Sequence, residues 1–350
     1  MNAIVYCEGA FATTYGKTAH GLVRFTERYR VRAVIDSSLA GQDAGDFLDG
    51  ENKGLPLVAD VDQALRLVPE FPAQPLRLVV GLALEGRVVP PGLHDAAFEA
   101  LQRGISIDSG LHLYLSEIPE LAAAAAASGA EILDIRRPAP VEHLHFFSGR
   151  IEEVGSKRIA VLGTDSALGK RTTAWKIVHT LKSRGLDCEM IGTGQTAWLQ
   201  GARYSIILDS IINDFVAGEI EHVICSAWDE AHPDYMIIEG QGSLMNPAFP
   251  GGFEILAAGR PDAIILQHAP GRLEYDGFPG YPIQALPLQI EIIELLSGKR
   301  VIAVAVNHEN LSPESIERAC AEIENETGLP ATDPIRQGPE RLVKAILELS

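Results

Sequence analysis

The sequence predicts an α/β protein of two domains, and three observations support this. Short apolar runs alternate with segments of helical periodicity along the whole chain, which is typical of parallel strands joined by crossover helices. The 350 residues suffice for two ordinary domains, and 46% of them are hydrophobic. The pattern breaks over residues 136–157, where two prolines and several polar residues interrupt it. We therefore expect one domain over residues 1–145 and a second over residues 146–350.

The first half of the chain predicts a Rossmann-like domain. Its apolar runs predict strands over residues 3–7, 31–35, 76–80, 105–107 and 131–135. Helical patterns fall between these strands, over residues 17–29, 61–67, 93–103 and 118–128. A glycine-containing loop follows the first strand, and Asp36 follows the second, where a ribose-binding acid would lie. The loop lacks the GxGxxG pattern, so we do not expect a nicotinamide cofactor here.

The second half repeats the alternation. Strands are predicted over residues 158–162, 188–191, 235–238, 263–267 and 301–306. A helix should follow each of the first two strands, and residues 283–296 and 340–349 predict two more. Apolar positions at helical spacing also occur within residues 204–221, which indicates a helix there. A mostly parallel sheet follows from this order of elements.

Composition restricts the partners of the protein. The formal net charge is −18, and such an acidic surface repels nucleic acid and anionic membranes. No apolar run approaches the roughly 18–20 residues of a membrane span. We therefore expect a small-molecule substrate, with neither nucleic acid nor membrane as a partner. Because α/β enzymes of this size commonly form symmetric dimers, we also expect a homo-oligomer.

The cysteines and the amino-terminal residues indicate a cytoplasmic protein. The four cysteines are far apart and show no CxxC spacing, so we expect buried free thiols in a reducing compartment. The chain begins with a strand-like run that has no basic region before it. No His, Cys or Asp cluster has the spacing of a zinc site, so no metal ligands are expected.

A phosphate-binding loop opens the second domain. The strand RIAVL runs directly into GTDSALGK, and the helical pattern KRTTAWKIVHTLKSRG follows at once. Strand, glycine loop and helix form the context that a P-loop requires, because the loop amides and the helix amino terminus then face an anion. We expect a P-loop NTPase-like fold whose ligand-binding residues are Gly163, Thr164, Asp165, Ser166, Ala167, Leu168, Gly169, Lys170, Arg171 and Thr172.

This loop departs from the usual P-loop in two ways. Five residues separate Gly163 from Gly169, where the common form has four. Arg171 occupies the position of the Ser or Thr whose hydroxyl holds Mg²⁺ in phosphoryl-transfer enzymes. We therefore expect the loop to hold a phosphorylated ligand without hydrolysing it.

Two resemblances bear on the activity. GTDSALGK resembles the GTDxxxGK loop of dethiobiotin synthetase and related ATP-dependent amide-forming enzymes, and IIEGQGS is similar to their EGAG stretch. A closer resemblance spans nearly the whole chain. The motifs GTDSALGKRTTA, GTGQT, DFVAGEIE, EGQGSLMNPAF and HAPGR, together with the amino-terminal EGAFATTYGKTAHGLVRF, resemble the D-glutamate N-acetyltransferase-like family.

The closer resemblance implies acetyl transfer from acetyl-CoA to the amine of D-glutamate or a similar acidic amino acid. On that basis the P-loop holds the phosphates of coenzyme A and performs no phosphoryl chemistry. The more distant resemblance implies an ATP- and Mg²⁺-dependent ligase instead. A non-catalytic nucleotide-binding protein is a third hypothesis, and the residues alone do not choose between these ligands.

Glu239 and His268 are the candidate general bases. Both follow predicted strands, so both should lie at the carboxyl edge of the sheet, where open α/β sheets bind ligands. The pKa of an unperturbed histidine lies near working pH, and a carboxylate can also take a proton from an attacking amine. The alternatives are a helix N-cap for Glu239 and a backbone-bonded loop residue for His268.

Three residues are candidates for substrate binding. Gln195 and Thr196 follow a strand in GTGQT and carry uncharged hydrogen-bonding groups, although a plain glycine turn explains them equally well. Arg272 could hold a substrate carboxylate through two parallel hydrogen bonds. Arg203 and Arg260 are alternatives for that role, and each alone is more often a surface salt-bridge residue.

Overall fold

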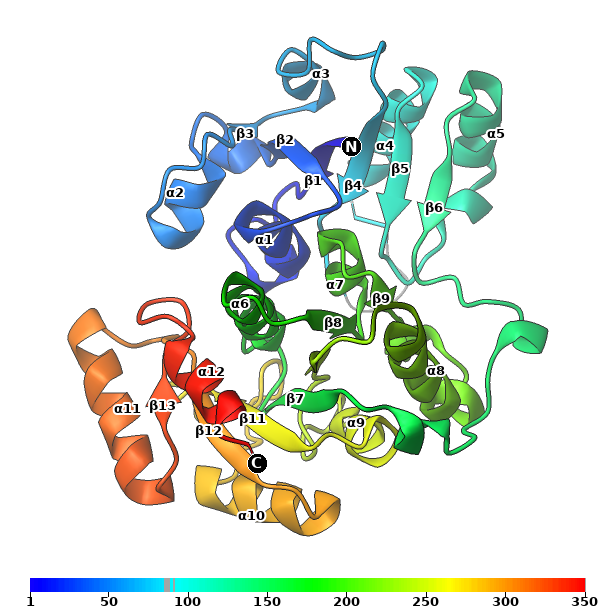
Figure 1. Ribbon diagram of the computed structural model, residues 1–350. Coiled ribbons are helices and arrows are strands. Elements are labelled where there is room, and N and C mark those ends of the chain that lie inside the picture. Colours follow the sequence, from blue (N-terminus) through cyan, green and yellow to red (C-terminus); the bar gives the residue numbers. More distant parts are fainter. Residues whose placement is uncertain (85–88, 91, 350) are drawn as a thin grey trace. The chain divides into compact units, whose positions relative to one another are not determined.

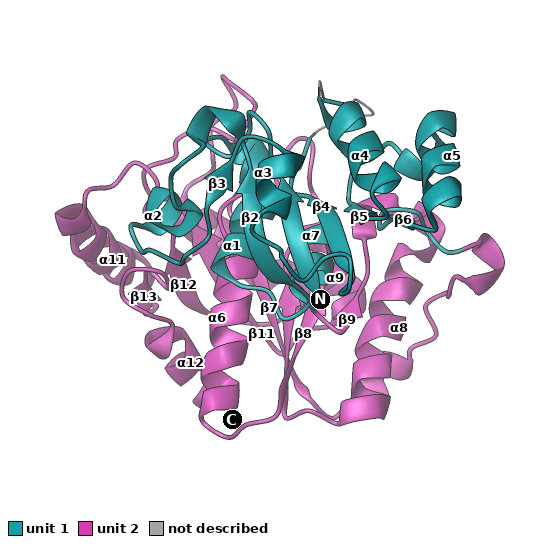
Figure 2. Ribbon diagram, turned by 90° about the horizontal axis from the view of Figure 1, so that it is seen from above, with its two compact units in different colours: residues 1–139, 195–201 teal, residues 140–194, 202–350 magenta. Residues whose placement is uncertain are grey.

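The computed structural model describes residues 1–84, 89–90 and 92–349. It forms two compact units, shown in separate colours in Figure 2. Unit 1 contains residues 1–139 and 195–201, and unit 2 contains residues 140–194 and 202–350. Each unit holds one sheet whose strand pairs are parallel, so the predicted α/β class is confirmed.

Unit 1 has the Rossmann-like architecture that the sequence predicts. Its sheet has the order β3-β2-β1-β4-β5-β6, so the order reverses between β1 and β4. The strands are β1 (Asn2–Tyr6), β2 (Arg30–Ile35), β3 (Leu57–Val58), β4 (Leu76–Val80), β5 (Ser106–Ser109) and β6 (Ile132–Asp134). The helices are α1 (Lys17–Arg24), α2 (Ala44–Asp49), α3 (Val61–Leu65), α4 (Leu93–Gln102), α5 (Pro119–Ser128) and, from the second half of the chain, α7 (Gln195–Gln200).

The residue patterns explain these elements. All five residues of β1 are buried, as expected for a central parallel strand covered by helices on both faces. Helix α5 begins at Pro119, which suits the first helical turn, and ends at Gly129 in the left-handed conformation. Helix α1 ends at Arg24, five residues before the predicted end at Tyr29, because Phe25 is already extended.

Unit 2 contains a seven-stranded sheet of order β13-β12-β11-β7-β10-β8-β9. The strands are β7 (Lys157–Gly163), β8 (Cys188–Gly192), β9 (Tyr204–Ser205), β10 (Tyr235–Glu239), β11 (Ala263–His268), β12 (Val301–Val306) and β13 (Ala331–Thr332). The helices of this unit are α6 (Lys170–Ser183), α8 (Asn213–Ala231), α9 (Gly252–Gly259), α10 (Leu286–Ser297), α11 (Pro313–Thr327) and α12 (Glu340–Leu347). The P-loop strand β7 is thus central.

Helices cover both faces of this sheet (Figure 1). Helices α6 and α12 pack together on one face, α6 over β7, β8 and β10 and α12 over β12. On the other face α9 packs against α8, α10 and β7. The apolar side chains between these layers, such as Leu162, Ile238 and Leu266, form the buried core of unit 2.

The structure corrects several predicted elements. A helix over residues 206–212 is wrong, because α8 begins only at Asn213 and a single 3₁₀ turn, Leu208–Ser210, precedes it. Helix α11 is not among the predicted helices, although Pro313 in its first turn and Gly328 after its end mark it. The strands β3, β9 and β13 have two residues each and are too short for a periodic pattern.

Two expectations about the whole chain can be compared with the structure. The four cysteines are free and buried, as expected; they are Cys7, Cys188, Cys225 and Cys320. Among the described residues, no helix combines the length and apolar character that crossing a membrane requires.

Candidate functional site

The sheet of unit 2 brings the P-loop and both candidate bases to one edge. Strand β7 lies between β10 and β11, and Gly163 at its end is paired with Gln267. Glu239 is the last residue of β10, and His268 is the last residue of β11. Because the strands are parallel, the two candidate bases flank the start of the P-loop at the carboxyl edge, as the sequence predicts.

The P-loop backbone is shaped to receive an anion. Ala167 and Gly169 have φ values of +51° and +93°, in the left-handed region, and an alanine rarely adopts this conformation. Among the described residues, no hydrogen bond uses the amide groups of Ala167, Leu168 or Gly169. These amides precede the 14-residue helix α6, whose first residue has no side-chain cap. Exposed amides at a helix amino terminus bind phosphate and carboxylate groups well.

Lys170 folds back over the loop. Its Nζ donates a hydrogen bond of 2.6 Å to the carbonyl of Asp165, and the residue is only 7% exposed. Gly163 allows this position, because a Cβ there would lie 2.9 Å from both Cδ and Nζ of Lys170. The ammonium charge is therefore held inside the loop, where it adds to the attraction for an anion.

Asp165 connects the loop to two distant segments. The carboxylate is fully buried and accepts hydrogen bonds from its neighbour Ser166 N at 2.7 Å and from Asn246 Nδ2, Arg272 Nη1 and Asp276 N, each at 2.8 Å. Four donors occupy the acceptor positions of a carboxylate. The side chain predicted to bind a cofactor therefore holds the loop in place, and the backbone around it faces the anion position.

Glu239 is a buried carboxylate next to the cations of the loop. Thr193 N donates to its Oε2 at 3.1 Å, and Thr193 Oγ1 donates to its backbone carbonyl at 2.9 Å. Gln241 Nε2 in turn donates to Thr193 Oγ1 at 2.8 Å. Burial raises the pKa of Glu239, and the charges of Arg171 and Lys170 act in the opposite direction. A carboxylate with a raised pKa is a stronger base than an exposed one.

His268 is a weaker base than an ordinary histidine. Its Nδ1 lies 3.0 Å from the hydroxyl of Thr164 in the P-loop. Burial lowers the pKa of His268 to about 4, so the ring is neutral at physiological pH. It can therefore accept a proton there, but with less driving force than Glu239.

Arg272 is already bonded to two carboxylates. Its Nη1 donates to Asp165 Oδ2 at 2.8 Å and to Ser166 O at 2.9 Å, and Nη2 pairs with Glu309. The side chain of Glu309 is 38% exposed, whereas that of Asp165 is fully buried. An incoming carboxylate could therefore replace Glu309 on this guanidinium without disturbing Asp165. The alternatives Arg203 and Arg260 pair with Glu230 and Glu152 on the surface.

Comparison with known proteins places this fold and loop in a family. Residues 145–343 match the P-loop domain of DUF1611, a domain of unknown function, and residues 37–138 match its Rossmann-like amino-terminal domain. The chain belongs to the DUF1611 family. A crystal structure of a DUF1611 protein from Anabaena variabilis shares 31% identity, covers 99% of both chains and superposes with a TM-score of 0.89.

Two curated relatives carry the same enzyme name. A protein from Tritonibacter scottomollicae named D-glutamate N-acetyltransferase is 34% identical over 275 residues, which span 77% of this chain and 80% of the relative. One of the same name from a Pseudoalteromonas species is 30% identical over 272 residues, 76% of this chain and 79% of the relative. This DUF1611 chain is thus an enzyme of the N-acetyltransferase class.

The structure groups Gln195 and Thr196 with the other unit. They begin helix α7 (Gln195–Gln200), which belongs to unit 1 together with the neighbouring core residue Leu199. The hydroxyl of Thr196 lies 2.9 Å from that of Thr18, and the buried amide oxygen of Gln195 has no hydrogen-bond partner in the part of the chain that the structure describes. Within unit 2, Thr193 contacts the candidate base Glu239, and Gln241 bonds to Thr193. Both residues lie in the motifs GTGQT and EGQGS, but the sequence alone predicts no role for them.

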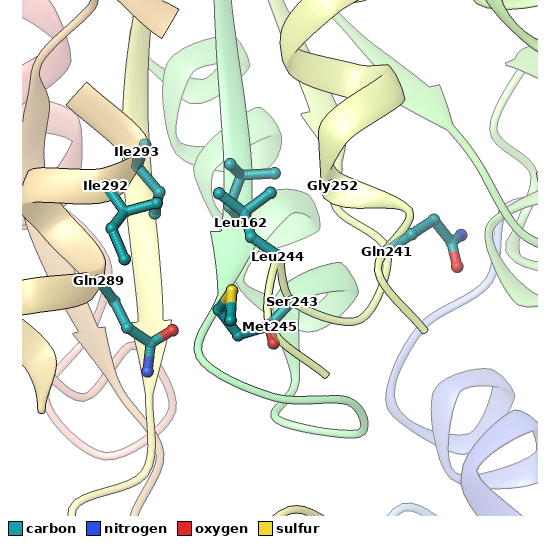
Figure 3. A pocket seen from close by; sticks show the side chains of 10 residues that line it. Leu162, Gln241, Ser243, Leu244, Met245, Gly252, Gln289, Ile292 and Ile293 are labelled. Atoms are coloured by element: carbon teal, nitrogen blue, oxygen red, sulfur yellow. The ribbon is translucent and has the colours of Figure 1, made fainter. Parts of the chain in front are cut away.

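A narrow apolar pocket opens beside the first residue of the P-loop in this DUF1611 protein (Figure 3). Leu162 and Leu244 form one side, and Ile292 and Ile293 of α10 form the other. The remaining lining residues are Gly163, Gln241, Ser243, Met245, Gly252 and Gln289. The free space corresponds to about one water-sized group, so the pocket admits only a small ligand group.

Proposed function

We propose that the protein transfers the acetyl group of acetyl-CoA to the amine of D-glutamate or a closely similar acidic amino acid. The P-loop backbone is the observation that carries this proposal. The N–H groups of Ala167, Leu168 and Gly169 precede helix α6 and have no partner within the described part of the chain, and Arg171 stands where a magnesium hydroxyl is needed. Such a loop suits a ligand whose phosphates bind to the loop while a different part of the ligand reacts.

The residues of the loop fit coenzyme A chemically. The amides and the buried ammonium of Lys170 supply hydrogen bonds and charge to a phosphate group, and a Cβ on Gly169 would meet only Asn307 Nδ2, at 3.8 Å. When bound, the thioester of acetyl-CoA supplies an activated acyl group. Every other part of the reaction falls to the side chains at the carboxyl edge of the sheet.

Glu239 is the base that the geometry favours. The substrate ammonium loses a proton to Glu239, its nitrogen then forms a bond to the acyl carbon, and the carbon–sulfur bond breaks. The sulfur leaves as a thiolate and takes up the second proton of the attacking nitrogen, while Glu239 returns its proton to solvent. The products are an N-acetyl amino acid and free coenzyme A. Direct attack of this kind needs no nucleophile from the enzyme.

The charge near Glu239 distinguishes this site from that of an ATP-dependent ligase. In a ligase the equivalent acid would serve a magnesium ion, whereas here the cation of Arg171 acts on Glu239. The acceptor carboxylate is assigned to Arg272, with displacement of Glu309 from its exposed side. An acidic acceptor matches this arrangement because it brings a carboxylate of the same chemistry as Glu309.

The experiment is an assay of free thiol from purified protein with acetyl-CoA and an amino-acid acceptor. We expect coenzyme A release with D-glutamate that clearly exceeds release with L-glutamate, glycine or no acceptor. Mass spectrometry of the product should show one added acetyl group. Thiol release at the no-acceptor background with every acidic amino acid would overturn the proposal. Magnesium-dependent release of ADP from ATP would favour the ligase instead.

A further inference from the structure

The apolar pocket beside the P-loop lies between the two functional parts of the proposed site. Leu162 and Gly163 line it from the end of β7, directly before the phosphate-binding residues. Gln241 and Ser243 line it from the loop after β10, two and four residues beyond Glu239. A group in this pocket would therefore lie near both the phosphate-binding residues of the P-loop and the proposed base Glu239.

The pocket excludes charged groups. None of the ten described residues that line it is charged, and Leu162 and Ile293 are each 2% exposed. Moving a carboxylate or phosphate into such surroundings carries a larger desolvation penalty than moving a neutral polar group. An acidic amino acid carries two carboxylates and an ammonium group, so the proposed acceptor does not fit this pocket. The methyl end of a short acyl group is uncharged and does fit it.

The width of the pocket depends on one glycine and on α10. A Cβ at Gly252 would lie 2.9 Å from Leu244 Cδ2, so only glycine leaves this wall in place. Ile292 and Ile293 close the opposite side (Figure 3). With space for about one water-sized group, the pocket accommodates a methyl group but no longer chain without rearrangement.

One hydroxyl in the wall has no partner. Ser243 is 2% exposed, and its Oγ makes no hydrogen bond among the described residues. The hydroxyl of Tyr275 lies near Ser243 Oγ but donates to Gln284 Oε1, and it makes no hydrogen bond of good geometry with Ser243. A buried hydroxyl without a partner is costly and calls for an explanation, and a ligand oxygen would supply one. Figure 3 shows Ser243 and Gln289 on opposite sides of the pocket, while the amide of Gln241 points away.

We propose that this pocket receives the acetyl group of the donor, that its walls restrict the enzyme to short acyl chains, and that the Ser243 hydroxyl binds the acyl carbonyl oxygen. The inference rests on the proposed function and deepens it, because it names the residues that select the acyl group. Ile292 sets the chain length, and Ser243 positions the carbonyl.

The test compares binding of free CoA, acetyl-CoA, propionyl-CoA and butyryl-CoA by calorimetry, with thiol-release rates measured beside it. The wild-type protein should bind acetyl-CoA about 10-fold or more tightly than butyryl-CoA. Ile292→Ala should remove most of this preference. Leu295→Ala is the matched control, because Leu295 lies on the same helix, is 81% exposed and does not line the pocket. If Ile292→Ala does not fold, Ile292→Val makes the same comparison with a smaller change.

Ser243→Ala tests the hydroxyl separately. Its Oγ makes no hydrogen bond of good geometry within the described part of the chain, and Tyr275 keeps its bond to Gln284, so the melting temperature should change little. Affinity for acetyl-CoA should fall about 2- to 10-fold, while affinity for free CoA stays constant. Equal losses for both ligands, or an unchanged acyl preference in the Ile292 variant, would overturn the inference. Absence of acetyl transfer by the wild-type protein would instead overturn the proposed function, since the binding preferences are measured without an acceptor.

Discussion

In each unit a glycine-containing loop follows the first strand in the chain, and the two loops differ in the hydrogen bonding of their backbone amides. In unit 1 two amides of the loop after β1 are used within the fold: Ala10 N donates to Cys7 O at 3.0 Å, and Phe11 N donates to Asp36 Oδ2 at 3.0 Å. In unit 2 the loop after β7 leaves the amides of residues 167–169 without partners among the described residues. A strand followed by a glycine-containing loop therefore does not by itself make an anion site.

The acids near these two loops differ in the same way. Asp36 is fully buried and accepts from Phe11 N, Ser38 N and Ser38 Oγ, so it serves the fold of unit 1. Glu239 is also buried, but it adjoins the positive charges of the P-loop, and its pKa is raised. The comparison indicates that a buried acid at a sheet edge is a candidate base when its environment shifts its pKa and leaves it near an open ligand position.

The largest expected effect is a loss of kcat that follows substitution of Glu239 but not of Asp36. Glu239→Gln removes the proposed base and should lower kcat about 10²- to 10⁴-fold. Asp36→Asn should leave kcat unchanged and lower the free energy of unfolding by about 1–3 kcal/mol, because it weakens charge-assisted hydrogen bonds. Steady-state kinetics and urea unfolding of both variants make the measurement. A wild-type kcat in Glu239→Gln would transfer the role of base to His268.

A smaller effect is expected on the affinity for coenzyme A, and it should differ between the two loops. Gly9 and Gly169 have φ values of +66° and +93°, so alanine at either position should cost about 1–2 kcal/mol of unfolding free energy. Only Gly169→Ala should weaken binding of coenzyme A, about 10-fold, because Gly169 leads directly into α6, whose amino terminus is the proposed phosphate site. Calorimetric titration of both variants gives the dissociation constants. Equal affinities in the two variants would show that the P-loop does not hold the ligand.

The smallest effect is a displacement of the pH profile. The cation of Arg171 lowers the pKa of Glu239, so Arg171→Met should raise that pKa, while Arg171→Lys should largely preserve it. A base must be unprotonated, and kcat/KM is lost as pH falls through its pKa. The acidic limb of the profile should therefore move to higher pH in Arg171→Met. An unmoved limb would mean that Glu239 is not the titrating group.

Much of the fold could be predicted because local periodicity determines it. Strands β4 and β12 lie where the apolar runs place them, and the P-loop follows from strand, loop and helix in sequence. Helix α7 shows the limit of prediction from local periodicity. Its local pattern is that of a helix after a strand of unit 2, yet Leu199 packs in the core of unit 1. Which core receives a short helix depends on distant residues.

The site could be predicted only in part, for a similar reason. The placement of Glu239 and His268 at the sheet edge follows from the sequence, because each ends a buried strand and strand ends are visible in a sequence. The partners of Arg272 were not visible, since Asp165 and Glu309 lie 107 and 37 residues away along the chain. Asp165 was predicted to contact the cofactor because it lies in the motif. Its four hydrogen-bond donors, three of them beyond its own neighbour, appear only in the folded chain.

The buried carboxylate of Asp165 has a consequence for how the site forms. Because one side chain joins the P-loop to Asn246, Arg272 and Asp276, the three segments cannot order independently. Their loss of conformational freedom is incurred when the domain folds, before any ligand arrives. The donor then meets a preorganised receptor, and its binding energy is not consumed in assembling loops. The same coupling makes Asp165 a point at which a single substitution would loosen three loops together.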